Sequence, residues 1–199
     1  MSNSIIYKNI HLYRLMMNTL YSLKYRKRFN DIVNEISEND KKILELCFGD
    51  ILIAEECRKR NIDWTGIDIS KNFVNFAIKN GYHAMMDDVT KLERLPSSDI
   101  CIMCGSLYHF HDEIELLLTK MLASAKRILI SEPVINLSAK KGFVGKLSRI
   151  LTNAGKGAEN FRFDEHSIIK TLDNLKNKMK FEYRVISKSR DIVIEIKKI

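Results

Sequence analysis

From Lys41 onwards, the chain alternates short, largely apolar runs with segments whose apolar residues recur at helical spacing. The first four apolar runs are expected to be strands, at residues 43–47, 64–68, 100–103 and 128–131. Apolar strands that alternate with amphipathic helices build a parallel sheet with both faces covered. The pattern therefore predicts an α/β fold.

The segments between these runs carry residues that typically begin and end helices. Ser70 precedes a helical pattern that Gly81 should end, because a side-chain oxygen caps a helix start and glycine adopts the left-handed conformation that follows a helix. Asp112 begins a sequence typical of a capping box, and Asp164 precedes a later helical pattern. Two final apolar runs within 181–196 are joined by a short polar link, which predicts an antiparallel hairpin.

Two further segments have helical patterns with basic polar sides. Residues 136–160 form one of them, and residues 5–36 form the other, which includes four lysines and arginines at 24–28. We predict one domain over residues 1–199, with 1–40 as a helical lid and 136–160 as a helical insertion that helps to close a ligand site. The apolar side of the first helix is predicted to include Leu12, Leu15, Met16, Leu20 and Leu23.

Charge is unevenly distributed along the chain. The formal net charge is +8, yet residues 43–136 contain 14 acidic and 10 basic side chains, so the basic excess lies in the two flanks. Basic flanks favour either solvated lysine-rich faces or an anionic partner such as a phospholipid surface, a phosphorylated substrate or RNA. We expect solvated faces, with peripheral membrane contact through the basic helices as the alternative, and no binding to DNA.

The four cysteines and five histidines have no spacing typical of a metal site, and we predict no metal. Cys101 and Cys104 lie in an apolar run, where free cysteine acts as a small buried hydrophobe. We find neither a secretory leader pattern nor an apolar stretch near the roughly 18 residues of a membrane span. The expected location is therefore cytoplasmic.

The first two strands end in the most informative motifs. The sequence ILELCFGD puts Glu45 inside the first strand and Gly49 in the turn after it, with Cys47 and Ile51 where a glycine-rich turn would have its other glycines. The later sequence GIDIS puts Asp68 at the tip of the second strand. In dinucleotide-binding folds, an acid about 20 residues beyond the glycine turn accepts hydrogen bonds from the ribose hydroxyls.

Three later motifs follow in order: DDV at 87–89, GSLYHFHD at 105–112 and SEP at 131–133. Together with ILELCFGD and GIDIS, they resemble the motif series of class I S-adenosylmethionine-dependent methyltransferases. The sequences LYHF, EPVINL, NAGKGAENFRF and SRDIV extend this likeness over nearly the full chain, where it is similar to a group of bacterial methyltransferases. The resemblance brings no substrate with it.

This resemblance implies a Rossmann-like sheet of seven strands, mostly parallel, with a C-terminal antiparallel hairpin, helices on both faces and S-adenosylmethionine as cofactor. It implies methyl transfer to a small-molecule, lipid or glycan acceptor, at oxygen, nitrogen or carbon. Asp88 would accept a hydrogen bond from the adenine amino group, and Val89 would pack on the adenine ring. The residues implied to bind the cofactor are Glu45, Cys47, Gly49, Asp68, Ile69, Asp88, Val89 and Gly105.

Catalysis of methyl transfer depends mainly on alignment of the acceptor, and a base is needed only for a hydroxyl or a protonated amine. His109, with Tyr108 as a second candidate, follows the third of the listed apolar runs, at the strand end where ligands bind in such sheets. We predict that His109 acts as a base or orients the acceptor. A purely structural role at a helix entrance is an equal alternative.

Three other functions remain as alternatives at this point. The first is an RNA-binding or RNA-modifying protein, although the basic stretches lack interleaved aromatic residues for stacking. The second is a non-catalytic S-adenosylmethionine binder on the same fold, which the replaced glycines favour. The third is a dehydrogenase, which would need the fuller G-x-G-x-x-G turn that this chain lacks.

Overall fold

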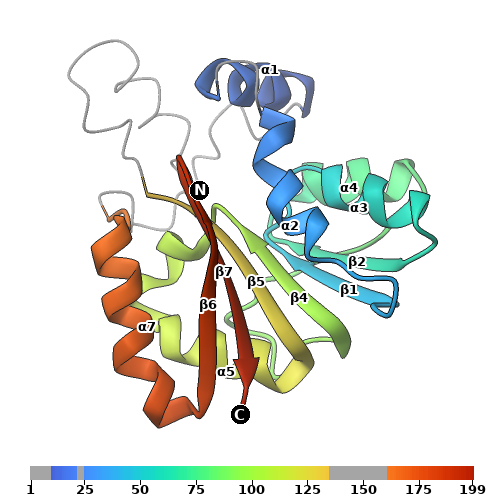
Figure 1. The fold of residues 1–199 in the computed structure, drawn as a ribbon. Coiled ribbons are helices and arrows are strands. Elements are labelled where there is room, and N and C mark those ends of the chain that lie inside the picture. Colours follow the sequence, from blue (N-terminus) through green and yellow to red (C-terminus); the bar gives the residue numbers. More distant parts are fainter. Residues whose placement is uncertain (1–9, 22–24, 135–160) are drawn as a thin grey trace.

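The computed structural model describes residues 10–21, 25–134 and 161–199. Its centre is one seven-stranded sheet in the order β3-β2-β1-β4-β5-β7-β6 (Figure 1). Strands β1 to β5 run parallel, and β7 is antiparallel to both β5 and β6. The predicted α/β fold, seven-stranded sheet and terminal hairpin are confirmed. The strands are β1 (Lys42–Leu46), β2 (Asp63–Asp68), β3 (His83–Met86), β4 (Ser98–Cys104), β5 (Ala125–Pro133), β6 (Phe181–Lys188) and β7 (Asp191–Lys198).

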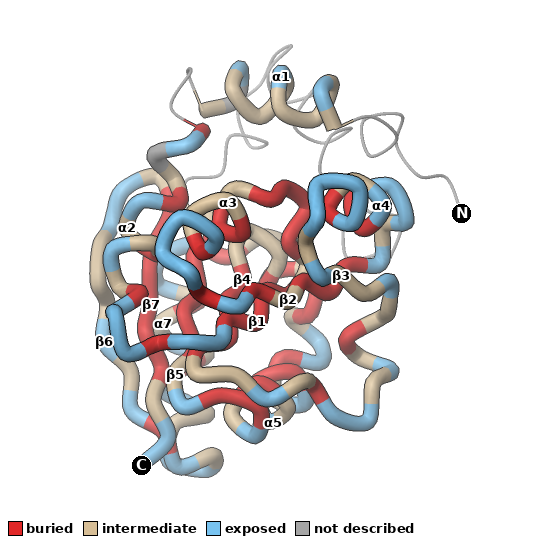
Figure 2. The backbone as a smooth tube through the Cα atoms, turned by 90° about the vertical axis from the view of Figure 1, so that its right-hand side faces the viewer, coloured by how far each residue is buried: buried red, intermediate tan, exposed pale blue. Residues whose placement is uncertain are grey.

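Helices cover both faces of the sheet, with α3 and α4 on one side and α5 on the other (Figure 2). Helix α7 lies on the same face as α5, because the two helices contribute to one apolar cluster. The predicted insertion at 136–160 lies outside the described residues. The helices are α1 (Ile10–Leu20), η2 (Tyr25–Phe29), α2 (Asn30–Asn34), α3 (Leu52–Lys59), α4 (Lys71–Lys79), η3 (Leu107–Glu113), α5 (Ile114–Ser124) and α7 (Glu165–Met179).

The core has two layers because successive strand residues point to opposite faces. In β1, Ile43 packs in the layer beneath α3 and α4, while Leu44 packs in the layer beneath α5 and α7. In β4, Ile102 and Met103 divide in the same way. A sheet buried on both faces explains why these strands are continuous apolar runs in the sequence.

The predicted helix ends are partly correct. The side chain of Asp164 accepts from the backbone of Ser167 in a capping box, and Gly81 adopts a φ of +75° after α4. Ser70 occupies the N-cap position of α4, but its side chain makes no capping hydrogen bond. The capping box predicted at Asp112 is wrong, because residues 107–113 form the 3₁₀ helix η3 and α5 begins only at Ile114.

The buried side of the first helix differs in part from the predicted one. Leu12 and Met16 are half-buried, and the burial of Leu20 and Leu23 lies outside what the structure describes. Leu15 is 64% exposed, whereas Ile10, Tyr13 and Met17 pack against the layer beneath α3 and α4. The reason is aromatic packing, since the Tyr13 ring lies edge-on to Phe73 of α4 with 5.1 Å between centroids. Spacing alone could not separate the two sides, because both carry apolar residues.

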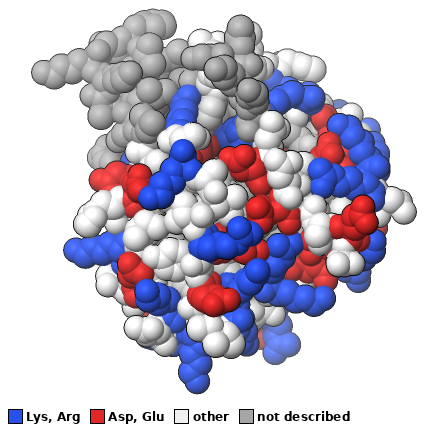
Figure 3. All heavy atoms as spheres, viewed as in Figure 1, with Lys and Arg blue, Asp and Glu red and all other residues white. Residues whose placement is uncertain are grey.

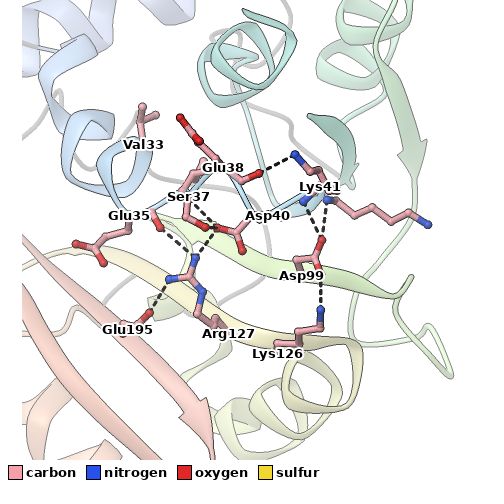
Figure 4. Close-up of polar contacts among 12 residues, drawn as sticks. Val33, Glu35, Ser37, Glu38, Asp40, Lys41, Asp99, Lys126, Arg127 and Glu195 are labelled. Carbon is pink, nitrogen blue, oxygen red and sulfur yellow. Dashed lines mark hydrogen bonds and ion pairs between the residues drawn. The ribbon is translucent and has the colours of Figure 1, made fainter. Parts of the chain in front are cut away.

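A polar network joins the leader, residues 10–41, to the amino ends of the strands (Figure 4). Arg127 at the start of β5 donates to Asp40 (2.7 Å), to Glu195 of β7 (2.9 Å) and to the Glu35 carbonyl oxygen. Beside it, the Asp99 carboxylate accepts from two backbone N–H groups, at residues 41 and 42, and from Lys126. These contacts fix the leader on the sheet before β1 begins.

Candidate functional site

The turn after β1 has the backbone of a glycine-rich turn although it contains one glycine. Cys47 and Gly49 adopt φ angles of +54° and +58°, in the left-handed region that glycine prefers. The Cys47 N–H donates to the Ile67 carbonyl oxygen of β2 (2.7 Å), which holds the turn against the neighbouring strand. Cys47 therefore supplies the conformation expected of the glycine that it replaces.

Asp68 at the tip of β2 faces this turn. Its Oδ2 accepts from the Gly49 N–H (3.0 Å), and its Oδ1 accepts from the Ser70 N–H (2.7 Å). Burial raises the pKa of Asp68 to about 6, although the two backbone donors act in the opposite direction. The next residue, Ile69, is 54% exposed despite its size. The structure thus brings Gly49 and Asp68 together, with an open apolar surface beside them.

Three other residues predicted to bind the cofactor already have partners within the protein. Glu45 is fully buried and accepts from the Trp64 indole N–H (2.8 Å), and burial raises its pKa well above the ordinary value. Asp88 is half-buried, and its Oδ1 accepts from the Thr90 backbone and hydroxyl (3.1 and 2.9 Å). Val89 is 3% exposed and packs in the core. Their predicted contacts with a cofactor stay predictions.

The leader covers the turn after β1. In Figure 1, α1 lies beyond the end of the sheet opposite the C-terminus of β7. Arg14 of α1 forms a two-pronged ion pair with Asp50 (2.7–3.1 Å), whose side chain has no exposed surface. A Cβ atom at Gly49 would lie 3.2 Å from the Tyr13 hydroxyl. The sequence analysis missed both Arg14 and Asp50, because nothing in the motif ILELCFGD distinguishes a structural acid from a ligand-binding one.

A second glycine with a left-handed backbone conformation, Gly105, directly follows β4. Gly105 has a φ of +65°, and its N–H donates to the Ser131 carbonyl oxygen of β5 (2.6 Å). The guanidinium of Arg28, from η2, lies against it. Glu132 at the end of β5 is fully buried and accepts from the Leu107 N–H (3.0 Å), and burial raises its pKa to about 8. The sequence analysis did not single out Arg28 or Glu132 as site residues.

The two predicted catalytic residues lie in η3, directly after Gly105. Tyr108 is 5% exposed, and the Arg162 guanidinium lies 3.8 Å from the centre of its ring. His109 is half-buried, with its ring 3.9 Å from that of Tyr108. The ring of His111 stacks on Phe161 at 4.2 Å, which favours a structural role for that histidine. His109 thus remains the better candidate at the acceptor side.

A cavity of about 390 Å³ opens at the opposite edge of the sheet, at the amino ends of the strands. Lys42, Asp63 and His83, which begin β1, β2 and β3, contribute to its lining. Ligands of open α/β sheets bind at the carboxyl ends of the strands, where the strand order reverses. In this sheet the reversal falls between β1 and β4, next to Gly49 and Gly105.

No protein-family model matches the chain, and a search of curated proteins finds no match. Solved structures do match. Magnesium protoporphyrin IX methyltransferase from Synechocystis PCC 6803, with bound S-adenosylhomocysteine, has a TM-score of 0.68 at 14% identity over 98% of this chain and 97% of that one. Plantazolicin methyltransferase, also with S-adenosylhomocysteine, has a TM-score of 0.63 at 13% identity, over 91% and 85%.

A further match is an S-adenosylmethionine-dependent methyltransferase from Thermotoga maritima, with a TM-score of 0.61 at 15% identity over 97% of this chain and 98% of that one. At such identities the likeness concerns the fold. The fold of this chain is therefore that of the S-adenosylmethionine-dependent methyltransferases, in agreement with the motif series.

Charges of both signs mix on the surface. Figure 3 shows basic and acidic side chains interspersed over one face of the molecule. In the terminal hairpin of β6 and β7, Arg184 and Lys197 pair with Glu195 at 2.6 and 3.1 Å. Among the residues that the structure describes, no helix has the length and apolar character needed to cross a bilayer.

Proposed function

We propose that this protein transfers a methyl group from S-adenosylmethionine to a small-molecule, lipid or glycan acceptor. The observation that carries the proposal is the Asp68 carboxylate, which lies at the tip of β2 and faces the Gly49 N–H at 3.0 Å. It is 6% exposed and stands beside the point where the strand order reverses. A buried carboxylate in this place fits the two hydroxyls of an unphosphorylated ribose.

The neighbouring residues fit the rest of a nucleoside. Each Asp68 oxygen has a second lone pair for a hydroxyl donor besides its backbone partner. The exposed Ile69 offers an apolar surface to the adenine ring, and Asp88 is the proposed acceptor for its amino group. The left-handed turns at Gly49 and Gly105 allow the backbone to approach a ligand closely. S-adenosylmethionine would supply a methyl group on a sulfonium, and the sulfur would leave as the neutral thioether of S-adenosylhomocysteine when the acceptor takes the methyl group.

The protein itself would have to hold and align the two reactants. Asp68 and Gly49 would fix the nucleoside, so that an acceptor over η3 meets the methyl group in line, and such positioning is a large part of the catalysis of a displacement. His109 would take the proton of a hydroxyl or amine acceptor, or orient the acceptor by a hydrogen bond. Tyr108 would line the same side.

Calorimetric titration with S-adenosylhomocysteine tests the first half of the proposal. We expect saturable binding to the wild-type protein and at least tenfold weaker binding to the Asp68→Ala variant. The matched control is Asp63→Ala, which removes an exposed acid from the other end of the same strand and should leave the affinity unchanged. Absence of binding to the wild-type protein at millimolar ligand would refute the proposal.

Turnover tests the second half. Formation of S-adenosylhomocysteine from S-adenosylmethionine should rise when the right acceptor is added from a panel of small hydroxyl, amine, thiol and carboxylate compounds, glycans and lipid vesicles. Comparing the rates of methyl transfer with neutral and with anionic vesicles tests membrane contact. Equal rates would rule out a role for an anionic membrane surface. Tight binding without turnover on any acceptor class would instead favour a non-catalytic binder.

A further inference from the structure

Arg28 is a buried cation at the carboxyl edge of the sheet. It comes from η2 in the leader, and only 5% of its side chain is exposed. The rings of Tyr21 and Phe29 lie 5.2 and 5.8 Å from its guanidinium carbon. Its Nε donates to Asp191 Oδ2 at 2.6 Å, at the start of β7. The start of β7, the last strand of the chain, therefore holds one edge of the guanidinium in place.

The other edge of the guanidinium lies against Gly105. A Cβ atom at that position would be 1.9 Å from Arg28 Nη2, so a side chain there would displace the arginine. Nη2 is buried and has no hydrogen-bond acceptor among the residues that the structure describes. A buried charged donor without an acceptor is costly, and such a group in a native protein calls for an explanation. A ligand that brings its own acceptor would supply one.

The charge around Arg28 favours an anionic acceptor. Among the described residues its ion-pair partner is Asp191, and a second guanidinium, that of Arg190, lies 3.8 Å from the ring of Tyr21. Glu132 stands nearby, but burial raises its pKa to about 8, so that it is largely protonated at neutral pH. Burial also raises the pKa of Cys104 well above its ordinary value, which keeps that thiol neutral. Neither Glu132 nor Cys104 therefore offers Arg28 a full negative charge at neutral pH.

The position of Arg28 relative to Asp68 identifies the anion. Strand β1 lies between β2 and β4, so the tips at Asp68 and Gly105 are two strand spacings apart, roughly 10 Å. Asp88, the proposed acceptor for the adenine amino group, follows β3, so a nucleoside held at Asp68 with its adenine at Asp88 would direct its 5′ substituent over β1 towards β4. In S-adenosylmethionine that substituent is an amino-acid chain, and it ends in a carboxylate.

We propose that Arg28 binds the carboxylate of the cofactor's methionine chain, that Asp191 positions the guanidinium, and that Gly105 leaves room for it. This inference rests on the proposed function. The receptor is formed jointly by the leader and the terminal hairpin, which are separated by about 160 residues of sequence. Neither of them belongs to the turn after β1, where Cys47 and Ile51 replace two of the glycines.

The test compares two ligands that differ in the amino-acid chain that carries this carboxylate. S-adenosylhomocysteine carries the amino-acid chain, whereas 5′-deoxy-5′-methylthioadenosine has the same nucleoside and sulfur without it. In calorimetric titrations, Arg28→Met should weaken binding of S-adenosylhomocysteine about 10- to 100-fold, as expected for loss of a charge-assisted hydrogen bond. Binding of methylthioadenosine should change less than twofold. Arg26→Met is the matched control, since Arg26 is exposed, pairs with Glu55 and should affect neither ligand.

Three results would overturn the inference while leaving the proposed function intact. Equal weakening of both ligands would show a structural role, and no weakening of either would assign Arg28 to something else, including a carboxylate on the acceptor. The third is that Arg28→Met fails to fold but Arg28→Lys and Asp191→Asn bind both ligands as wild type does. We expect Arg28→Lys and Asp191→Asn each to weaken the binding of S-adenosylhomocysteine at least fivefold more than the binding of methylthioadenosine. A wild-type protein that binds neither ligand would instead refute the proposed function.

Discussion

Cys47 shows how a residue can replace a glycine without changing the turn. It stands at the first glycine position of the motif and keeps a φ of +54°, which costs a residue with a side chain roughly 1–2 kcal/mol. The sequence could predict the turn and the place of Asp68, because both follow from the spacing of strand tips. It could not predict that Cys47 would adopt the glycine conformation, since the strain is offset by contacts with the neighbouring strand.

Replacing Cys47 by glycine should therefore stabilise the protein. We expect Cys47→Gly to raise the free energy of unfolding by about 1 kcal/mol, less whatever packing the half-buried thiol provides. Asn61→Gly is the comparison, because Asn61 also has a positive φ (+56°) but asparagine tolerates it better, so the gain should be smaller. Urea unfolding of the three proteins measures this, and a less stable Cys47→Gly variant would contradict it.

Glu132 should make stability depend on pH. Its pKa is about 8 in the folded protein against an ordinary value of 4.5, because burial penalises the charged form. Between these two pH values the folded state keeps a proton that the unfolded chain has released, so its contribution to stability falls as the pH rises from about 4.5 to 8. Glu132→Gln keeps an acceptor for the Leu107 N–H but removes the proton.

Urea unfolding at pH 5, 6.5 and 8 tests this expectation. The Glu132→Gln variant should lose less stability across the series than the wild-type protein does, by roughly 1.4 kcal/mol for each pH unit in the affected range. Glu182→Gln, at an exposed position on β6, serves as the control and should follow the wild-type curve. Parallel curves for Glu132→Gln and wild type would show that Glu132 is not protonated in the folded state.

At the scale of elements, the strands were more predictable than the helices that cover them. Burial on both faces makes a strand apolar along its whole length, and this pattern identifies β1, β2, β4 and β5 from the sequence. The leader was harder to predict from the sequence, because the buried side of α1 depends on which of its apolar residues contacts Phe73. For the same reason, the sequence could not show that Arg28 lies against Gly105.

The Arg14–Asp50 pair should control the docking of α1. Arg14→Met keeps the apolar stem but leaves the buried Asp50 carboxylate without its cation, a change that costs about 1–3 kcal/mol when one partner remains partly exposed. We expect faster amide hydrogen exchange throughout α1 in this variant. Arg26→Met removes a surface pair from the same leader and should leave exchange in α1 unchanged. Unchanged protection of α1 in Arg14→Met would mean that aromatic packing alone docks the helix.

At the scale of the whole molecule, the leader contacts the terminal hairpin at both ends of the strands. Arg28 joins the leader to β7 at the carboxyl edge, and Arg127 joins the leader, β5 and β7 at the amino edge (Figure 4). Such links between distant segments follow from the strand order, which places β7 inside the sheet next to β5. A sequence pattern predicts the hairpin but not the side chains that it brings to the leader.

Loss of the Arg127 network should destabilise the whole fold. Arg127→Met removes the cation shared by Asp40 and Glu195, and we expect the free energy of unfolding to fall by about 1–3 kcal/mol, since Glu195 keeps Arg184 and Lys197 as partners. The matched control is Lys126→Met, at the preceding position of the same strand, where the side chain is 80% exposed and the loss should stay below about 1 kcal/mol. Equal effects of the two substitutions in urea unfolding would contradict this account.

The central claim is that Asp68 holds a ribose over the turn at Gly49. A crystal structure of the protein with S-adenosylhomocysteine tests it most directly. The account predicts both ribose hydroxyls within hydrogen-bond distance of the Asp68 carboxylate, and the amino-acid chain directed towards Gly105. A nucleoside bound elsewhere, with Asp68 bonded to the Gly49 and Ser70 backbone alone, would contradict it.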